Sequence, residues 1–102
     1  MKPSQRIEFV IGASHLQHLL DKIDQAGAPG WTVIHHVMGR GGRGIQSADE
    51  LSGTSSNAYV IVAAPSDKTK TIVDAAQPIL ARAGGLCLIS DCQHVQHHPK
   101  ET

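Results

Sequence analysis

Apolar and polar positions alternate in the first part of the chain, and the pattern then changes to a helical period. In residues 6–12 (RIEFVIG), alternate side chains lie on one side of an extended segment: Ile7, Phe9 and Ile11. Ser14 and Gln17 have the spacing of a capping box at a helix start. Apolar residues then repeat on one helical face: Leu16, Leu19, Leu20 and Ile23. We therefore expect a strand followed by a helix that ends at Gly27.

Two further segments have strand composition, and a long segment separates them. Residues 31–38 (WTVIHHVM) and 57–65 (NAYVIVAAP) are rich in β-branched side chains. Residues 39–56 between them show no hydrophobic period and consist mostly of small, polar and charged residues. A loop of this length is uncommon in a compact domain and is usually functional or disordered. We therefore expect a strand, a long functional or disordered loop, and another strand.

The C-terminal third predicts a second helix and a final strand. Ser66 is the expected cap of a helix that runs to about Ala83, and Pro78 is expected to kink or shorten it. The sequence AGG ends this helix. Residues 86–91 (LCLISD) are the expected fourth strand, and QHVQHH after it is expected to add a short edge strand before a frayed tail.

The expected order is βαββαβ in one domain, residues 1–102, which is the ferredoxin-like split βαβ arrangement. The fold class is therefore α+β, with an antiparallel sheet that carries both helices on one face. The strands at 31–38 and 57–65 are apolar at both parities, so the other face of the sheet also needs cover. Since no further segment remains to cover it, we expect a homo-oligomer whose sheets face inward.

Composition argues against several classes of partner. Nine basic residues balance nine acidic ones, so no net field attracts nucleic acid or an anionic membrane surface. No segment has the roughly 20 apolar residues of a membrane span, and the N-terminus lacks the apolar run of a signal peptide. We therefore expect a cytoplasmic protein without membrane insertion. Cys87 and Cys92 would lie about 16 Å apart in a strand, too far for a disulfide, so both are expected to be free thiols.

Residues 39–44 (GRGGRG) combine a permissive backbone with permanent positive charge. Four glycines allow successive N–H groups to form an anion-binding nest: Gly39, Gly41, Gly42 and Gly44. Arg40 and Arg43 add planar guanidinium groups that suit a phosphate or a planar anion such as bicarbonate. Composition alone favours a solvated hairpin loop, with an RNA contact as a further alternative, because the segment matches no strict phosphate-binding motif.

The seven histidines raise the possibility of a metal site. His35 and His36 are adjacent in a strand, so they are expected to face opposite sides and not to chelate together. A transition-metal site near the C-terminus would combine Cys92, His94, His97 and His98, whereas simple solvent or polar contacts are the alternative for His15, His18 and His98. The serines and acidic residues of the long loop have no histidine beside them in sequence, so no catalytic constellation is expected. The protein is therefore predicted not to be an enzyme, and no metal site is assigned.

The stretch GWTVIHHVMGRGGRG (residues 30–44) resembles the strand and loop base of PII signalling proteins, which read Gly-x-Thr-Val and then Val-x-Gly-x-Gly. The similarity covers nearly the whole chain, through AAPSD at the second helix to Gly-Gly before the last strand. GRGGRGIQSADE and GGLCLISD are similar to the carboxysome- or inorganic-carbon-associated branch of that family rather than to its nitrogen branch.

The resemblance implies a homotrimer of ferredoxin-like subunits that bind adenine nucleotides in three clefts between subunits. Residues 39–56 are then the T-loop, which changes shape with the bound effector and docks on or releases a partner. The similarity to carbon-linked relatives implies that the protein senses bicarbonate and adenylate state. The implied partner is therefore a bicarbonate transporter or another carbon-uptake protein.

The chain departs from the nitrogen branch at the positions that bind the ligand and at the position in the long loop that is covalently modified. The long loop has no tyrosine for covalent modification, and ARAGGLC lacks the basic stretch before the last strand. Ile61 stands where the nitrogen type has a glutamate near the 2-oxoglutarate and Mg site, and two phosphate-clamping arginines correspond to about His97 and Pro99. We therefore expect ADP or AMP to bind better than a triphosphate.

The expected nucleotide and anion site combines a hydroxyl for an adenine edge, two glycine-rich stretches and one imidazole: Thr32, Gly39, Arg40, Gly41, Gly42, Arg43, Gly84, Gly85 and His97. Gly84 and Gly85 are alternatively a simple helix C-cap, and both roles are compatible. The first hypothesis is a sensor of ADP or AMP and bicarbonate that needs no cofactor and acts through an order–disorder change in residues 43–56. The alternative is a metal-responsive or copper-tolerance-type module of the same fold.

Overall fold

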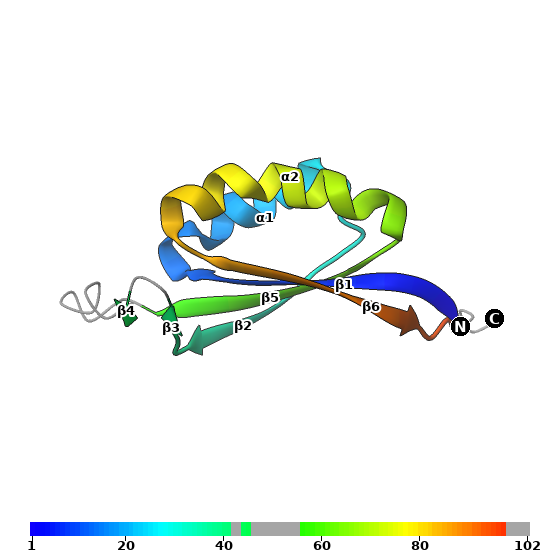
Figure 1. Cartoon of the computed structure of the whole chain (residues 1–102), viewed down its shortest axis with the longest axis horizontal. Coiled ribbons are helices and arrows are strands. Elements are labelled where there is room, and N and C mark those ends of the chain that lie inside the picture. Colours follow the sequence, from blue (N-terminus) through cyan, green and yellow to red (C-terminus); the bar gives the residue numbers. More distant parts are fainter. Residues whose placement is uncertain (42–43, 46–55, 98–102) are drawn as a thin grey trace, which may run out of the picture.

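The computed structural model describes residues 1–41, 44–45 and 56–97. They form β1 (Lys2–Gly12), the 3₁₀ turn η1 (Ala13–His15), α1 (Leu16–Gln25), β2 (Thr32–Val37), β3 (Arg40–Gly41), β4 (Gly44–Ile45), β5 (Asn57–Ala64), α2 (Ser66–Ala83) and β6 (Leu86–His94). The long strands form one antiparallel sheet in the order β2-β5-β1-β6, and β3 pairs with β4. Both helices cover one face of the sheet (Figure 1). The expected α+β ferredoxin-like βαββαβ sandwich is therefore confirmed.

The hydrophobic core lies between this sheet and the helices and follows the alternation in the sequence. The register of β1 and β5 places Phe9 opposite Val60 and Ile7 opposite Val62, and these side chains are buried. The helices contribute their apolar faces: Leu19, Leu20, Ile23, Ile72, Ala76 and Ile79. Each large side chain buried here stabilises the fold by about 1.5–3 kcal/mol relative to an exposed position.

The start of α1 differs from the capping pattern in the sequence. Ser14 lies inside the 3₁₀ turn that leads into the helix, so the expected capping box of Ser14 and Gln17 is wrong. Gln17 Nε2 instead donates to Asp21 Oδ1 at 2.9 Å. The Ala13 N–H donates to the Ser56 carbonyl at 2.7 Å. This tertiary contact ties the end of β1 to the start of β5 and thereby sets where the helix can begin.

The second helix begins one residue earlier than the expected Ser66 cap implies, and Pro78 does not end it. Pro65 is the N-cap and Ser66 is the first helical residue, so the expected Ser66 cap is wrong. The helix runs to Ala83, which confirms its expected end, and it continues through Pro78, so shortening, one of the two effects expected of this proline, is wrong. Pro78 is exposed, whereas Ala76 and Ile79 on either side of it are buried. Packing against the core therefore holds both halves of the helix in place despite the missing proline N–H.

The last strand is longer than its sequence pattern. Residues 92–94 continue β6, and His94 pairs with Lys2 at the start of an equally extended β1. The separate short edge strand that was expected from QHVQHH is therefore wrong. Cys87 and Cys92 both lie on β6 as free thiols, in agreement with the prediction from their spacing.

An irregularity interrupts β2 before it reaches the long loop. The register with β5 shifts between Ile34 and Val37, and His36 has a positive φ of 62°. The ring centroids of His35 and His36 are only 5.9 Å apart. The expectation that these two rings face opposite sides of a regular strand is therefore wrong, because the bulge turns the backbone between them.

The sheet face opposite the helices carries exposed apolar side chains. Ile34, Leu86 and Leu88 lie on this face and are 53%, 50% and 53% exposed. Tyr59 and Val10 lie between them in register and are partly buried. The expected second apolar face is therefore present, and we call it the open face. No helix in the described part of the chain is long and apolar enough to cross a lipid bilayer.

Candidate functional site

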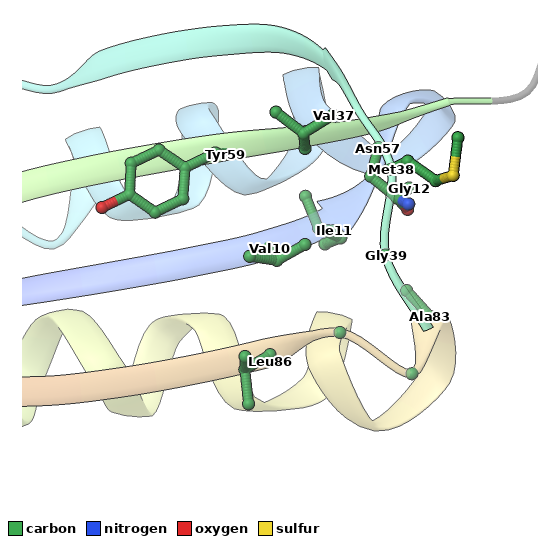
Figure 2. Close-up of a pocket in the computed structure, with 12 residues that line it drawn as sticks. Val10, Ile11, Gly12, Val37, Met38, Gly39, Asn57, Tyr59, Ala83 and Leu86 are labelled. Carbon is green, nitrogen blue, oxygen red and sulfur yellow. The ribbon is translucent and has the colours of Figure 1, made fainter. Parts of the chain in front are cut away.

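A cleft of about 300 Å³ lies at the end of the sheet where the long loop begins. Four parts of the chain build it: the end of β1, the segment that follows β2, the start of β5 and the turn from α2 into β6. Figure 2 shows the segment after β2, which carries Met38 and Gly39, passing Asn57 and continuing toward Ala83. The cleft therefore joins the base of the long loop to the α2–β6 turn.

The turn from α2 into β6 brings bare backbone to one wall of this cleft. Gly84 has a left-handed φ of 77° and its N–H donates to the Leu80 carbonyl at 2.8 Å, so it is the C-cap of α2. Gly85 packs against β1 so closely that an added Cβ would lie 2.7 Å from the Val10 carbonyl oxygen. Both glycines thus have a structural role, and both also border the cleft.

The opposite wall comes from the end of β2 and the first residue of β5. Asn57 pairs with Val37 on one side and with Gly12 of β1 on the other. Met38 and Gly39 follow Val37 along the edge of the cleft, and Met38 is 92% exposed. The strand pairing therefore fixes the position of this wall. Met38, in contrast, presents an exposed apolar side chain at the rim of the cleft.

The lining is mostly apolar, and no charged side chain of a described residue contributes to it. Tyr59 and Asn57 supply the polar side chains. The Tyr59 hydroxyl donates to Glu8 Oε2, and Arg6 Nε lies 3.4 Å from Glu8 Oε1. The hydrogen bond to the Glu8 carboxylate, with partial burial, raises the pKa of Tyr59 above its ordinary value. Tyr59 therefore stays neutral, and the cleft can take a flat apolar group with few polar contacts.

The structure brings together some of the residues predicted for the site and separates others. Gly39, Gly84 and Gly85 line the same cleft, and β3 begins with Arg40 and Gly41 directly after Gly39. Gly42 and Arg43 lie outside the described residues, as does most of the predicted T-loop.

Two predicted site residues lie away from this cleft within the subunit. Thr32 is at the other end of β2, in register with Ile61. His97 follows β6, whose last residue, His94, pairs with Lys2 at the far end of β1. Neither residue belongs to the cleft lining. Any contribution they make to the same ligand would therefore have to come from a second copy of the chain.

Several lining residues were not anticipated from the sequence: Val10, Gly12, Met38, Asn57, Tyr59 and Leu86. They belong to three strands, β1, β5 and β6, and to the segment after β2, and only the strand register brings them together. The position of Asn57, at the junction of the long loop and a strand, is the one local signal that could have singled it out.

The described residues, which include His94 and His97 but not His98, contain no group of three or more histidine, cysteine, aspartate or glutamate side chains placed to hold a metal ion. His35 and His36 stay a pair of neighbouring rings in β2.

Comparison with solved structures gives the same fold. CPII from Thiomonas intermedia K12, a PII-like protein solved with ADP, AMP and bicarbonate, is 22% identical, with 90% of this chain and 88% of that chain covered and a TM-score of 0.79. A PII-like signalling protein from Thermus thermophilus is 15% identical, with coverage of 92% and 90% and a TM-score of 0.71. The GlnK–ATP complex of B. subtilis is 13% identical, with coverage of 90% and 84% and a TM-score of 0.62. No curated protein matches the chain.

The family assignment rests on the sequence as a whole. The model of the nitrogen regulatory protein P-II family matches residues 4–99, which is nearly the full length and includes every residue that lines the cleft. The chain therefore belongs to the nitrogen regulatory protein P-II family.

Proposed function

We propose that the protein is a non-enzymatic PII-like sensor of the inorganic-carbon branch, which binds ADP or AMP together with bicarbonate in clefts between the subunits of a homotrimer. The observation that carries this proposal is the cleft that joins Gly39, at the base of the long loop, to Gly84 and Gly85. A ligand held there contacts the point from which the loop departs. Ligand binding can thus bias the conformation of residues 39–56.

The character of the cleft fits an adenine nucleotide with a short phosphate chain. Its apolar lining suits a flat base, and its described side chains carry no charge that would hold a triphosphate. The negative end of the ligand then needs the glycine-rich backbone and the charges of Arg40 and Arg43, which follow Gly39 in the sequence. Gly41 and Gly42 provide the unhindered N–H groups between the two arginines.

Trimer formation would complete the site. Leu86 belongs both to the cleft and to the open face, so a subunit that covers the open face also approaches the cleft. Thr32 and His97 lie elsewhere in their own subunit, and we propose that they reach the ligand from a neighbouring one. CPII of Thiomonas intermedia K12, with ADP, AMP and bicarbonate bound, is the structural neighbour that supports this choice of ligands.

Regulation would follow from a difference in affinity between two states of the loop. Nucleotide and bicarbonate shift residues 43–56 toward one conformation only if they bind that conformation more tightly. The loop in that conformation docks on, or releases, a bicarbonate transporter or another protein of carbon uptake. The protein would thereby report the supply of inorganic carbon and the adenylate state to the uptake machinery.

The proposal is tested by calorimetry and thermal unfolding with AMP, ADP, ATP, bicarbonate, 2-oxoglutarate, copper and zinc. We expect ADP or AMP to raise the unfolding midpoint and bicarbonate to raise it further, since ligands that bind the native state stabilise it by mass action. The double variant Arg40→Ala/Arg43→Ala should weaken nucleotide and bicarbonate binding by about tenfold or more. Arg82→Ala, which removes an exposed arginine of α2 outside the cleft, is the matched control.

Two results would contradict this function. Unchanged effector affinity in the Arg40→Ala/Arg43→Ala variant would leave the loop as a simple connector. A large stabilisation by copper or zinc, with no response to ADP and bicarbonate, would instead support the metal-responsive alternative.

A further inference from the structure

Asn57 occupies a buried position in the wall of the cleft. It is the first residue of β5, it is 7% exposed, and it lines the cleft. Its backbone is held on both sides, by Val37 of β2 and by Gly12 of β1. The side chain therefore projects from a fixed point, which is the condition for precise recognition of a ligand.

The carboxamide of Asn57 makes no hydrogen bond to another described residue. The neighbouring polar group of the cleft, the Tyr59 hydroxyl, is already engaged by Glu8. Thr69, another buried polar residue, has its hydroxyl within 3.5 Å of the Pro65 carbonyl. Figure 2 shows the amide end of Asn57 beside Gly12 and Met38, at the cleft. No side-chain nitrogen or oxygen of a described residue is both fully buried and unpaired, so the Asn57 amide keeps access to the cleft, where a ligand can pair with it.

The location of this amide indicates which end of a ligand it meets. Asn57 lies across from Val37, two residues before Gly39, so it is near the point where the chain continues into Arg40 and the glycine-rich stretch. The base of a nucleotide fits the apolar part of the lining around Val10 and Leu86. Asn57 therefore lies on the side of the cleft where an anion would be held.

A carboxamide has a specific complement among small anions. It offers N–H donors and a carbonyl acceptor and carries no charge. Bicarbonate has anionic oxygens that accept hydrogen bonds and a hydroxyl that donates one, so it can pair with both ends of the amide. Acetate has no hydroxyl, and it can use only the donor end. A lysine or arginine at this position would instead add charge that favours a dianion.

We infer that Asn57 is a specificity-determining residue that reads bicarbonate in the cleft, with its Nδ2 donating to an anionic oxygen and its Oδ1 accepting from the bicarbonate hydroxyl. This inference rests on the proposed function, because it assigns a residue to the anion part of the same site. According to this inference, the neutral side chain of Asn57 is the reason that the site prefers bicarbonate to a plain carboxylate.

The test compares Asn57→Asp and Asn57→Leu with the wild-type protein by calorimetry. Bicarbonate and acetate are titrated in the presence of saturating ADP, and ADP is titrated alone. Asn57→Asp removes the donor and adds a negative charge, and Asn57→Leu keeps a similar volume without polar atoms. We expect Asn57→Asp to raise the bicarbonate Kd by about tenfold or more, and by a larger factor than the ADP Kd.

The ratio of bicarbonate to acetate affinity is a measurement that would not change if Asn57 had only a structural role. The wild-type protein should prefer bicarbonate to acetate, and Asn57→Leu should lose that preference, because only the amide distinguishes the hydroxyl. Gln77→Glu makes the same change from amide to carboxylate at an exposed position of α2 and should leave both affinities unchanged. Unfolding midpoints identify any variant whose fold is impaired, and Asn57→Ser then serves as the milder replacement.

The outcomes separate this inference from the proposed function. If the wild-type protein binds neither ADP nor bicarbonate, the proposed function and the role of Asn57 are both overturned. If it binds both, and the bicarbonate Kd and the ratio of bicarbonate to acetate affinity are unchanged in Asn57→Asp and Asn57→Leu, the role of Asn57 alone is overturned.

Discussion

At the scale of single residues, the cleft depends on where the chain lacks a side chain. Gly85 lies where the turn after α2 passes the backbone of β1, and the Val10 carbonyl oxygen occupies the space that a Cβ would need. Backbone atoms on a central strand cannot move away without breaking strand pairing. Gly30, in contrast, has nothing within 4 Å of an added Cβ.

Replacement of Gly85 by alanine should therefore lower the free energy of unfolding by about 1–3 kcal/mol, the range observed for overpacked sites. Gly30→Ala is the matched control and should change stability by less than about 0.5 kcal/mol. Chemical denaturation of both variants checks this expectation. Equal stability of the two variants would mean that the turn relaxes without cost and that Gly85 is not needed for packing.

Tyr59 gives a second residue-scale prediction, which concerns pH. Its hydrogen bond to the Glu8 carboxylate raises the Tyr59 pKa above the ordinary value of 10.0. The stabilisation is therefore present below that ordinary pKa and is lost as pH rises through the folded pKa. Tyr59→Phe should be about 1 kcal/mol less stable than the wild type at neutral pH, and the difference should shrink at alkaline pH.

The folded-state pKa of Tyr59 can be measured directly. Tyr59 is the one tyrosine in the chain, so the ultraviolet absorbance of its phenolate follows this residue alone. Glu8→Gln should lower the pKa toward its ordinary value, because it removes the carboxylate that accepts the hydrogen bond. A wild-type pKa at or below the ordinary value would contradict the hydrogen bond.

At the scale of elements, the hydrophobic pattern predicts which faces are buried but not how the elements begin and end. The alternation in residues 6–12 correctly identifies Ile7, Phe9 and Ile11 as core, because the period of a strand is a local property of the backbone. The capping box predicted for α1 is wrong, because the start of this helix depends on a hydrogen bond between Ala13 and Ser56, which is distant in sequence. Likewise, β6 extends because β1 provides a partner strand for its last residues.

The bulge in β2 leads to a prediction for this element. His36 has a positive φ, which is unfavourable for a residue with a side chain and acceptable for glycine. His35 lies in the same strand but does not have a positive φ. We expect His36→Gly to raise stability by about 0.5–1 kcal/mol and His35→Gly to lower it by a similar amount. Thermal unfolding of the two variants measures the difference, and loss of stability in both would show that the bulge does not strain His36.

At the scale of the whole molecule, the open face connects association with ligand binding. Its exposed apolar side chains lie on the outer strands β2 and β6, and Leu86 continues this face into the cleft. A monomer would leave this surface in water, which is unfavourable for a small protein. We therefore expect the chain to associate through this face and its nucleotide affinity to depend on that association.

Leu88→Lys tests both expectations. Leu88 is 53% exposed in the isolated subunit and lies across from Glu8, so a lysine is tolerated there before association but is costly once the face is covered. The wild type should have three times the 10.8 kDa mass of the chain in light scattering, and Leu88→Lys should be smaller and bind ADP more weakly. Gln77→Glu on α2 is the control. An unchanged mass for Leu88→Lys would place the interface elsewhere.

The sequence by itself determined the order of strands and helices, the buried faces, the second apolar face and the glycine-rich loop base, since each depends on local periodicity or on backbone freedom. Membership of the family followed from matches spread over nearly all residues. Only the tertiary structure decided that Gly39 meets Gly84 and Gly85, that Thr32 and His97 lie apart from them, and that Asn57 lines the cleft. These relations depend on strand register, in which a shift of one residue reverses every side chain, and no local pattern fixes it.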